Sequence, residues 1–86
     1  MNYKDAIIKT EQFLDKIPIE KYIVEPVCDL AKVMYKIEND YSDSLSNDEF
    51  FCGYVFNWMS TDEFASYLKR KGYNVQSEII ERFYIL

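Results

Sequence analysis

The sequence contains no histidine. This absence removes the usual general base of nucleophilic triads and the commonest protein ligand of zinc. Only two glycines are present, Gly53 and Gly72, so the chain has no glycine-rich loop for phosphate. The two cysteines, Cys28 and Cys52, are 24 residues apart and form no C-x-x-C motif. We therefore expect no enzyme, no cofactor and no metal site.

Long apolar runs are also missing. The longest uncharged run, residues 50–61, is too short to cross a bilayer core of about 30 Å as a helix. Residues 1–17 are amphipathic and interspersed with charges, unlike a signal peptide. Both cysteines lie among apolar neighbours, which favours buried, reduced thiols. We expect a cytoplasmic protein without membrane contact.

Lysine and arginine are absent from residues 37–68, where about four would be expected at the overall frequency of 10 in 86. Seven carboxylates lie in that window: Glu38, Asp40, Asp43, Asp48, Glu49, Asp62 and Glu63. The whole chain carries a net charge of −5. Because nucleic acids and anionic membranes bind positive faces, we expect direct binding to neither.

Composition and periodicity predict one all-α domain over residues 1–86. The chain is 49% hydrophobic and 17% aromatic, with only two prolines. Apolar spacing predicts a first helix over residues 3–16, ended by Pro18. A second apolar stripe runs from Ile23 to Tyr41, with Pro26 in its first turn and a short separate turn near residues 19–25.

Capping signals divide the rest of the chain. Residues 39–47 are predicted to be a polar loop, followed by a capping box of Ser46 and Glu49 and a central helix over residues 50–59. The aromatic content of 50–59 also suits a strand. A second box, Ser60 with Glu63, begins a helix that ends near Gly72. Ser77 caps a last segment over residues 78–84. The expected fold is a compact single-domain bundle of four to five short helices.

The segment from Glu38 to Glu49 resembles an EF-hand calcium loop. Oxygen side chains fall at loop positions one, three, five, nine and twelve, with apolar Leu45 at position eight. Asp43 stands where such loops carry the glycine of their sharp turn. An acidic connection between helices, closed by a capping box, explains the same residues, so calcium stays outside the prediction.

The segment from Asp62 to Phe83 resembles the helix, G-Y-x-V turn and second helix of some winged helix-turn-helix repressors. This resemblance implies a small transcriptional regulator whose second helix contacts DNA through Asn74, Gln76, Ser77 and Arg82. The basic cluster at residues 69–71 agrees with it. Glu78 and Glu81 on the same helix would repel phosphates.

The acidic, aromatic middle of the chain supports the leading hypothesis. Phe50, Phe51, Phe56 and Trp58 are expected in the core, whereas Tyr41, Tyr54 and Tyr67 are candidate surface anchors. Together with the seven carboxylates, they would dock on a protein partner with a basic, nucleic-acid-handling surface. Capping explains Asp48, Glu49, Asp62 and Glu63, so Glu38, Asp40 and Asp43 lack a structural role.

Three functional classes follow from this pattern. The leading one is a small inhibitor or modulator, because short acidic chains of this composition are typical of phage anti-defence proteins, anti-CRISPRs among them, and of nuclease immunity proteins. The alternative is the winged-helix-like regulator. A homodimer that buries its exposed aromatic residues is the third.

Overall fold

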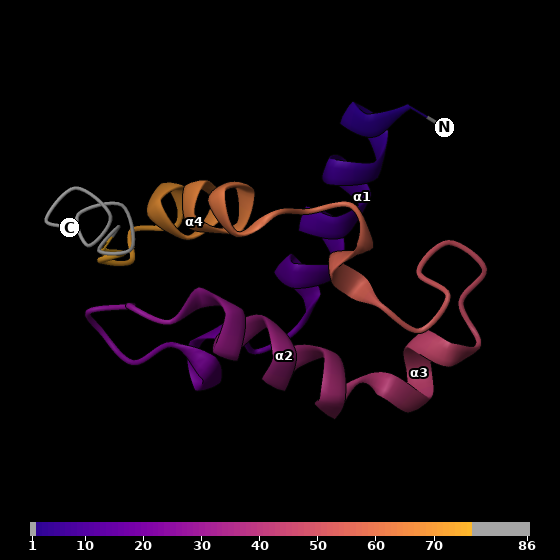
Figure 1. Cartoon of the computed structure of the whole chain (residues 1–86), viewed down its shortest axis with the longest axis horizontal. Helices are drawn as coiled ribbons and strands as arrows, with labels where there is room; N and C mark the ends of the chain where they lie inside the picture. The colour runs from indigo at the N-terminus through magenta and orange to yellow at the C-terminus, as the bar shows by residue number, and fades with distance from the viewer. Residues whose placement is uncertain (1, 77–86) are drawn as a thin grey trace, which may run out of the picture.

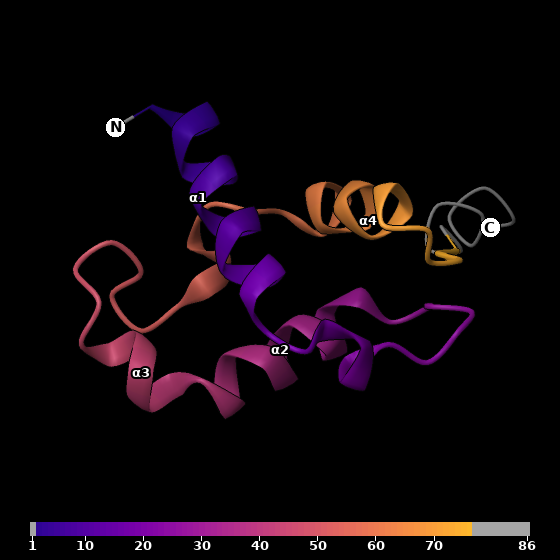
Figure 2. The same cartoon turned by 180° about the vertical axis from the view of Figure 1, so that it is seen from behind.

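The computed structural model describes residues 2–76. Its elements are helices connected by turns: α1 (Tyr3–Lys16), η1 (Ile19–Tyr22), α2 (Leu30–Asp40), α3 (Ser42–Ser46), η2 (Val55–Asn57) and α4 (Thr61–Arg70). Within this part of the chain there is no strand, and the predicted all-α bundle is confirmed. Helices α2 and α3 follow one another along one side, α4 lies opposite, and α1 runs crosswise to both (Figures 1 and 2).

Helix α1 begins and ends where its sequence predicts. The side chain of Asn2 accepts a hydrogen bond from the Asp5 N–H at 2.9 Å and caps the first turn. Ala6, Thr10 and Leu14 form its buried face. The hydroxyl of Thr10 donates to the Ala6 carbonyl at 2.9 Å, which satisfies the buried polar group.

The second helix begins at Leu30, so the prediction that it extends back to Ile23 is wrong. Asp29 caps it by accepting the Lys32 N–H at 3.1 Å. The residues before it use their backbone elsewhere: Val27 forms a parallel bridge with Val75, donating to Asn74 at 2.8 Å and accepting from Gln76 at 2.9 Å. In a helix, the Val27 N–H and carbonyl would bond within the helix and could not reach Asn74 and Gln76. Local apolar spacing does not reveal a partner so distant in sequence. The separate turn before it is η1.

Most of residues 39–47 are helical, so the predicted polar loop is wrong. Helix α2 continues to Asp40 and α3 covers Ser42–Ser46. The Ser46–Glu49 capping box does not form, because the Ser46 hydroxyl donates back to the Asp43 carbonyl at 2.8 Å. Asp48 takes the capping role and accepts the N–H groups of the next two phenylalanines.

The predicted central helix over residues 50–59 is also wrong. Cys52 and Gly53 have φ angles of +52° and +92°, which turn the chain out of any right-handed helix. The Gly53 N–H donates to the Leu45 carbonyl at 2.9 Å and closes the turn against α3. Only η2, three residues long, is helical in this segment.

Helix α4 confirms its capping box. The Glu63 carboxylate accepts the Ser60 N–H at 2.8 Å, and the Ser60 hydroxyl accepts the Glu63 N–H at 3.3 Å. Gly72, with φ of +96°, follows the C-terminus as predicted. The segment predicted after Ser77 lies outside the described residues.

The core contains apolar side chains from every element: Leu14, Ile19, Val27, Met34, Ile37, Leu45, Phe51, Val55, Met59, Phe64, Tyr67 and Leu68. Phe51 is buried as predicted, whereas Phe50 and Phe56 are half-buried. Trp58 is 43% exposed and Cys28 and Cys52 are exposed, so these three predictions of burial are wrong. No helix in the described part of the chain is long and apolar enough to cross a membrane.

Substitutions on α2 test which of its faces belongs to the core. Ile37 is fully buried and Tyr35, two residues earlier, is 70% exposed. We expect Ile37→Ala to lower the free energy of unfolding by about 2–5 kcal/mol, because it leaves a cavity. Tyr35→Ala should change it by about 0.5 kcal/mol or less. Urea denaturation followed by circular dichroism measures both, and equal losses would contradict this division.

Candidate functional site

The seven predicted carboxylates form two separate groups. Five follow one another from the end of α2 through α3 into the next turn, and Asp62 and Glu63 begin α4. The start of α4 lies apart from α3 in both views of the molecule (Figures 1 and 2). The structure therefore does not bring all seven onto one face.

Two carboxylates predicted to lack a structural role have one. The Glu38 carboxylate accepts the Phe56 N–H at 3.0 Å and so ties η2 to α2. The Asp40 carboxylate accepts the Tyr22 hydroxyl at 2.6 Å and ties η1 to the end of α2. This contact raises the pKa of Tyr22 well above its usual value.

Capping occupies two further carboxylates. Asp48 accepts the N–H groups of Phe50 and Phe51 at 2.8 and 3.1 Å, and Glu63 forms the capping box of α4 and accepts the Tyr3 hydroxyl. Of the seven predicted carboxylates, three are exposed and form no side-chain hydrogen bond or ion pair within the described residues: Asp43, Glu49 and Asp62. Asp43 and Glu49 belong to the first group.

Of the three predicted tyrosine anchors, only Tyr54 is exposed. Tyr67 is buried and Tyr41 is half-buried, with its ring edge against Phe13 at 5.7 Å between centroids. Sequence reasoning missed Tyr35, the most exposed tyrosine among the described residues. The sequence could have indicated its exposure, because Tyr35 follows Met34 directly and so falls outside the apolar stripe of α2.

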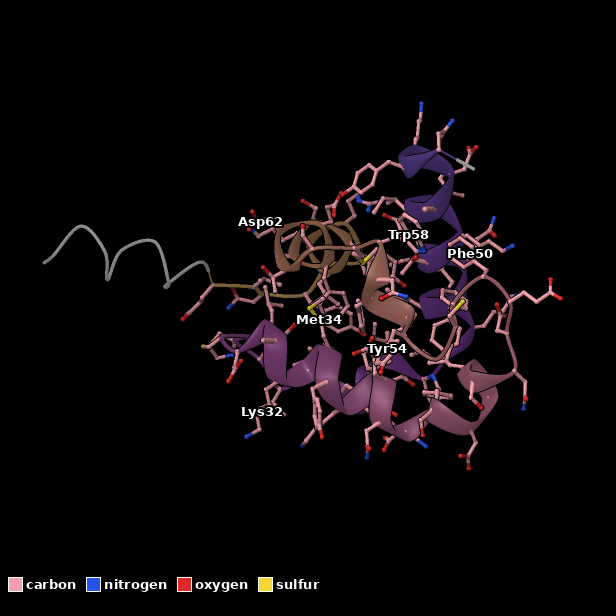
Figure 3. The ribbon with its side chains drawn as sticks, turned by 45° about the vertical axis from the view of Figure 1, so that its right-hand side comes forward. Lys32, Met34, Phe50, Tyr54, Trp58 and Asp62 are labelled. Atoms are coloured by element: carbon pink, nitrogen blue, oxygen red, sulfur yellow. The ribbon has the colours of Figure 1, made fainter. Side chains whose placement is uncertain are left out.

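Tyr35 and Tyr54 border a shallow hollow of about 180 Å³ between α2 and the turn at Gly53. Glu38, Asn39 and Ser42 line the rest of it. Figure 3 shows Tyr54 beside the second half of α2, the half that leads into α3. We use the name acidic end for Tyr54 together with the exposed carboxylates Asp43, Asp48 and Glu49.

The acidic end is not isolated from basic residues in space. The ammonium group of Lys9, on α1, lies 4.8 Å from the ring centroid of Phe50. Phe50 in turn stacks on Trp58, with 6.2 Å between ring centroids (Figure 3). Because α1 contributes this lysine, the base-free stretch of sequence does not make a base-free surface.

The basic cluster after α4 pairs with carboxylates of α1. Arg70 forms an ion pair with Glu11, and Lys71 forms one with Asp15 at 2.9 Å. Lys71 is the main reason that the pKa of Asp15 lies below its usual value. Two of the three bases that favoured a winged-helix resemblance are therefore engaged within the domain.

The EF-hand geometry does not form between α2 and α3. Glu38 and Asp40 lie in a helix and turn toward Phe56 and Tyr22. Within the described residues, no group of three or more carboxylates or cysteines converges as a metal site. No family model, curated protein or solved structure matches the chain, so its own residues carry the functional argument.

Alanine substitutions separate structural carboxylates from unengaged ones. E38A and D48A should each lower the free energy of unfolding by about 1–3 kcal/mol, because each leaves backbone N–H groups without an acceptor. D43A and E49A should change it by about 0.5 kcal/mol or less. Thermal and urea unfolding of the four variants gives the answer, and a uniform effect would contradict the assignment.

Acid unfolding tests the capping carboxylate of α4. Hydrogen bonds from Ser60, and then from Tyr3, hold the pKa of Glu63 below its usual value. Its stabilising contribution is therefore complete above the unfolded-state pKa and is lost as pH falls through the folded-state pKa. E63Q should flatten the fall in stability below about pH 5, whereas the neighbouring D62N should not. Equal pH profiles for the two variants would contradict this role.

Proposed function

We propose that this protein is a non-enzymatic binding protein whose acidic end docks on the basic surface of a protein partner. One observation carries the proposal: Tyr54, 61% exposed, shares a hollow with Ser42 at the start of α3. Asp43 on α3 and Glu49 in the turn after it are exposed carboxylates that form no side-chain hydrogen bond or ion pair within the described residues. These side chains contribute little to folding, so their arrangement fits contact with another molecule.

The chemistry of the acidic end suits such a partner. Carboxylates around an interface speed the approach of a basic surface and reject acidic ones. An exposed tyrosine supplies a large apolar area with few rotatable bonds, which is why tyrosines are frequent hot spots. The docking set is narrower than the seven carboxylates of the sequence, because Glu38 and Asp40 hold the fold and Asp62 and Glu63 lie elsewhere.

The class of partner follows from where basic surfaces occur. Most strongly basic protein surfaces bind nucleic acid, and carboxylates placed on them compete with phosphates. An inhibitor or modulator of a nucleic-acid-handling protein, as among phage anti-defence and nuclease immunity proteins, is the function that this chemistry favours. The analogy with those proteins is one of composition.

Matched charge reversals test the proposal. D43K/E49K reverses two carboxylates of the acidic end, and D5K/E20K reverses two exposed carboxylates on α1 and η1. Each pair raises the net charge from −5 to −1, and each includes one first-turn aspartate. Tagged proteins are exposed to extract of the native cell at low salt, and the retained basic proteins are quantified.

We expect D43K/E49K to lose at least about tenfold of the retention and D5K/E20K to keep it, because only the former changes the docking charges. Tyr54→Ala should lose a comparable amount. Equal retention by both reversal pairs would refute the proposal. A gel shift with random-sequence duplex DNA at low salt tests the winged-helix alternative, and the docking function predicts no shift.

A further inference from the structure

The hollow between α2 and the turn at Gly53 is lined by the two most exposed tyrosines of the described residues. Tyr35 is 70% exposed and Tyr54 is 61% exposed. Within the described residues, neither side chain forms a hydrogen bond or contacts another ring or a cation. Phe50 and Tyr67, by contrast, have cations of the domain itself against their rings. We call this place the tyrosine hollow.

Helical spacing brings the other lining residues together. Tyr35, Glu38, Asn39 and Ser42 follow one another at intervals of three, one and three residues, which places them on one face of α2 and the start of α3. Tyr54 completes the lining from the turn after α3. A carboxylate, an amide and a hydroxyl thus share the hollow with two aromatic rings, and no basic residue of the described part of the chain lines it.

Glu38 is the charged residue of the tyrosine hollow, and its contact with the fold does not neutralise it. Its Oε2 atom accepts the Phe56 N–H at 3.0 Å, but that donor is uncharged. An ionised carboxylate has about four acceptor sites, so Glu38 can bind further donors. Glu38 forms no ion pair within the described residues and is half-buried, where solvent and salt screen its charge less than on an open surface. The hollow therefore attracts cations.

The backbone that carries Tyr54 is held on both sides. Before it, the Gly53 N–H donates to a carbonyl of α3 at 2.9 Å, and after it the Phe56 N–H donates to Glu38. Cys52 has a φ angle of +52°, which is costly for a residue with a side chain and persists only where the surrounding structure imposes it. The hollow is thus formed before a ligand arrives, and binding needs little ordering of the backbone.

The guanidinium group of arginine matches this set of groups. It is planar, stacks on aromatic rings and carries five N–H donors in a fixed fork, whereas the ammonium of lysine is compact, strongly hydrated and has three donors. The hollow, at about 180 Å³, is smaller than the pockets of about 300–1,000 Å³ that enclose whole small-molecule ligands. Its size therefore suits a single side chain that enters from a larger molecule.

We propose that the tyrosine hollow binds an arginine side chain of a protein partner, with the guanidinium against Tyr35 and Tyr54 and its donors toward Glu38. This inference rests on the proposed docking function and names the residue type that the basic partner presents. The exposed carboxylates Asp43 and Glu49 steer the approach, and the hollow fixes the position of the partner on the acidic end.

Single amino-acid probes test the hollow without the partner. N-acetylarginine amide is added to the full chain at constant ionic strength, and the backbone amide signals of Asn39, Ser42 and Gly53 are followed by NMR. We expect saturable shifts with a Kd of about 1–10 mM, as is usual for a ligand of this size. N-acetylcitrulline amide, which has a similar shape without the charge, should bind at least about tenfold more weakly, and N-acetyllysine amide at least about threefold. Absence of saturable shifts, or equal affinity for either of the other probes, would overturn the proposal.

Paired variants identify the groups that bind the probe. E38Q removes the charge but keeps an oxygen that accepts the Phe56 N–H, and D62N makes the same change of charge on α4. Y54L removes the aromatic ring, and Y54F keeps it. The arginine probe should bind E38Q and Y54L at least about threefold more weakly, and D62N and Y54F within about twofold of the unchanged chain. Equal affinity within either pair would contradict the assignment.

The hollow and the docking function fail by different results. A chain that binds no arginine probe, yet loses its retention of basic proteins in D43K/E49K, would refute the hollow alone. A chain that binds the probe as expected, yet retains basic proteins equally in D43K/E49K and D5K/E20K, would refute the docking function alone.

Discussion

The joining of α1 to α4 depends on one buried side chain, Tyr67. Its ring stacks on Phe64, with centroids 6.5 Å apart, and its hydroxyl donates to Asp15 on α1 at 2.7 Å. Burial and this hydrogen bond raise the pKa of Tyr67, so the hydroxyl keeps its proton and remains a donor. Lys71 binds the same carboxylate and Arg70 binds Glu11 one turn away, and both cations lie within 6 Å of the Tyr67 ring centroid, at 5.4 and 5.9 Å. The buried tyrosine is therefore surrounded by the polar contacts that join the two helices.

The contacts between α1 and α4 determine which charged side chains of the domain are paired. Helix α1 supplies carboxylates to the basic end of α4, so two of the three bases there gain partners within the domain. Beside α2, by contrast, Lys21, Lys32 and Lys36 line two shallow hollows and form no ion pair within the described residues. At the far end of α2, Glu38 accepts the Phe56 N–H and Asp40 accepts the Tyr22 hydroxyl, whereas Asp43 and Glu49 beyond it accept no hydrogen bond at their carboxylates from any described residue. The two ion pairs of the described residues thus join α1 to the end of α4, and the lysines beside α2 stay unpaired.

Apolar spacing and capping residues predicted the fold correctly where no contact with a distant part of the chain overrides them. Helix α1 and the capping box of α4 follow from spacing and caps alone. The start of α2 depends on Val75, 48 residues away, and Asp48 captures the turn that Ser46 was expected to cap. The site divides likewise: Tyr54, Asp43 and Glu49 are as exposed as predicted, but Tyr67, Glu38 and Asp40 have long-range partners that sequence does not reveal.

Helix α2 and the segment after it serve the fold and the surface with alternate residues. Glu38 and Asp40 hold η2 and η1, and Ile37, which directly precedes Glu38, is fully buried. The lysines and Tyr35 on the outer side give the fold no ion pair and little burial, and Lys32 and Lys36 repel each other. Such an arrangement is stable only because the inner face compensates for it.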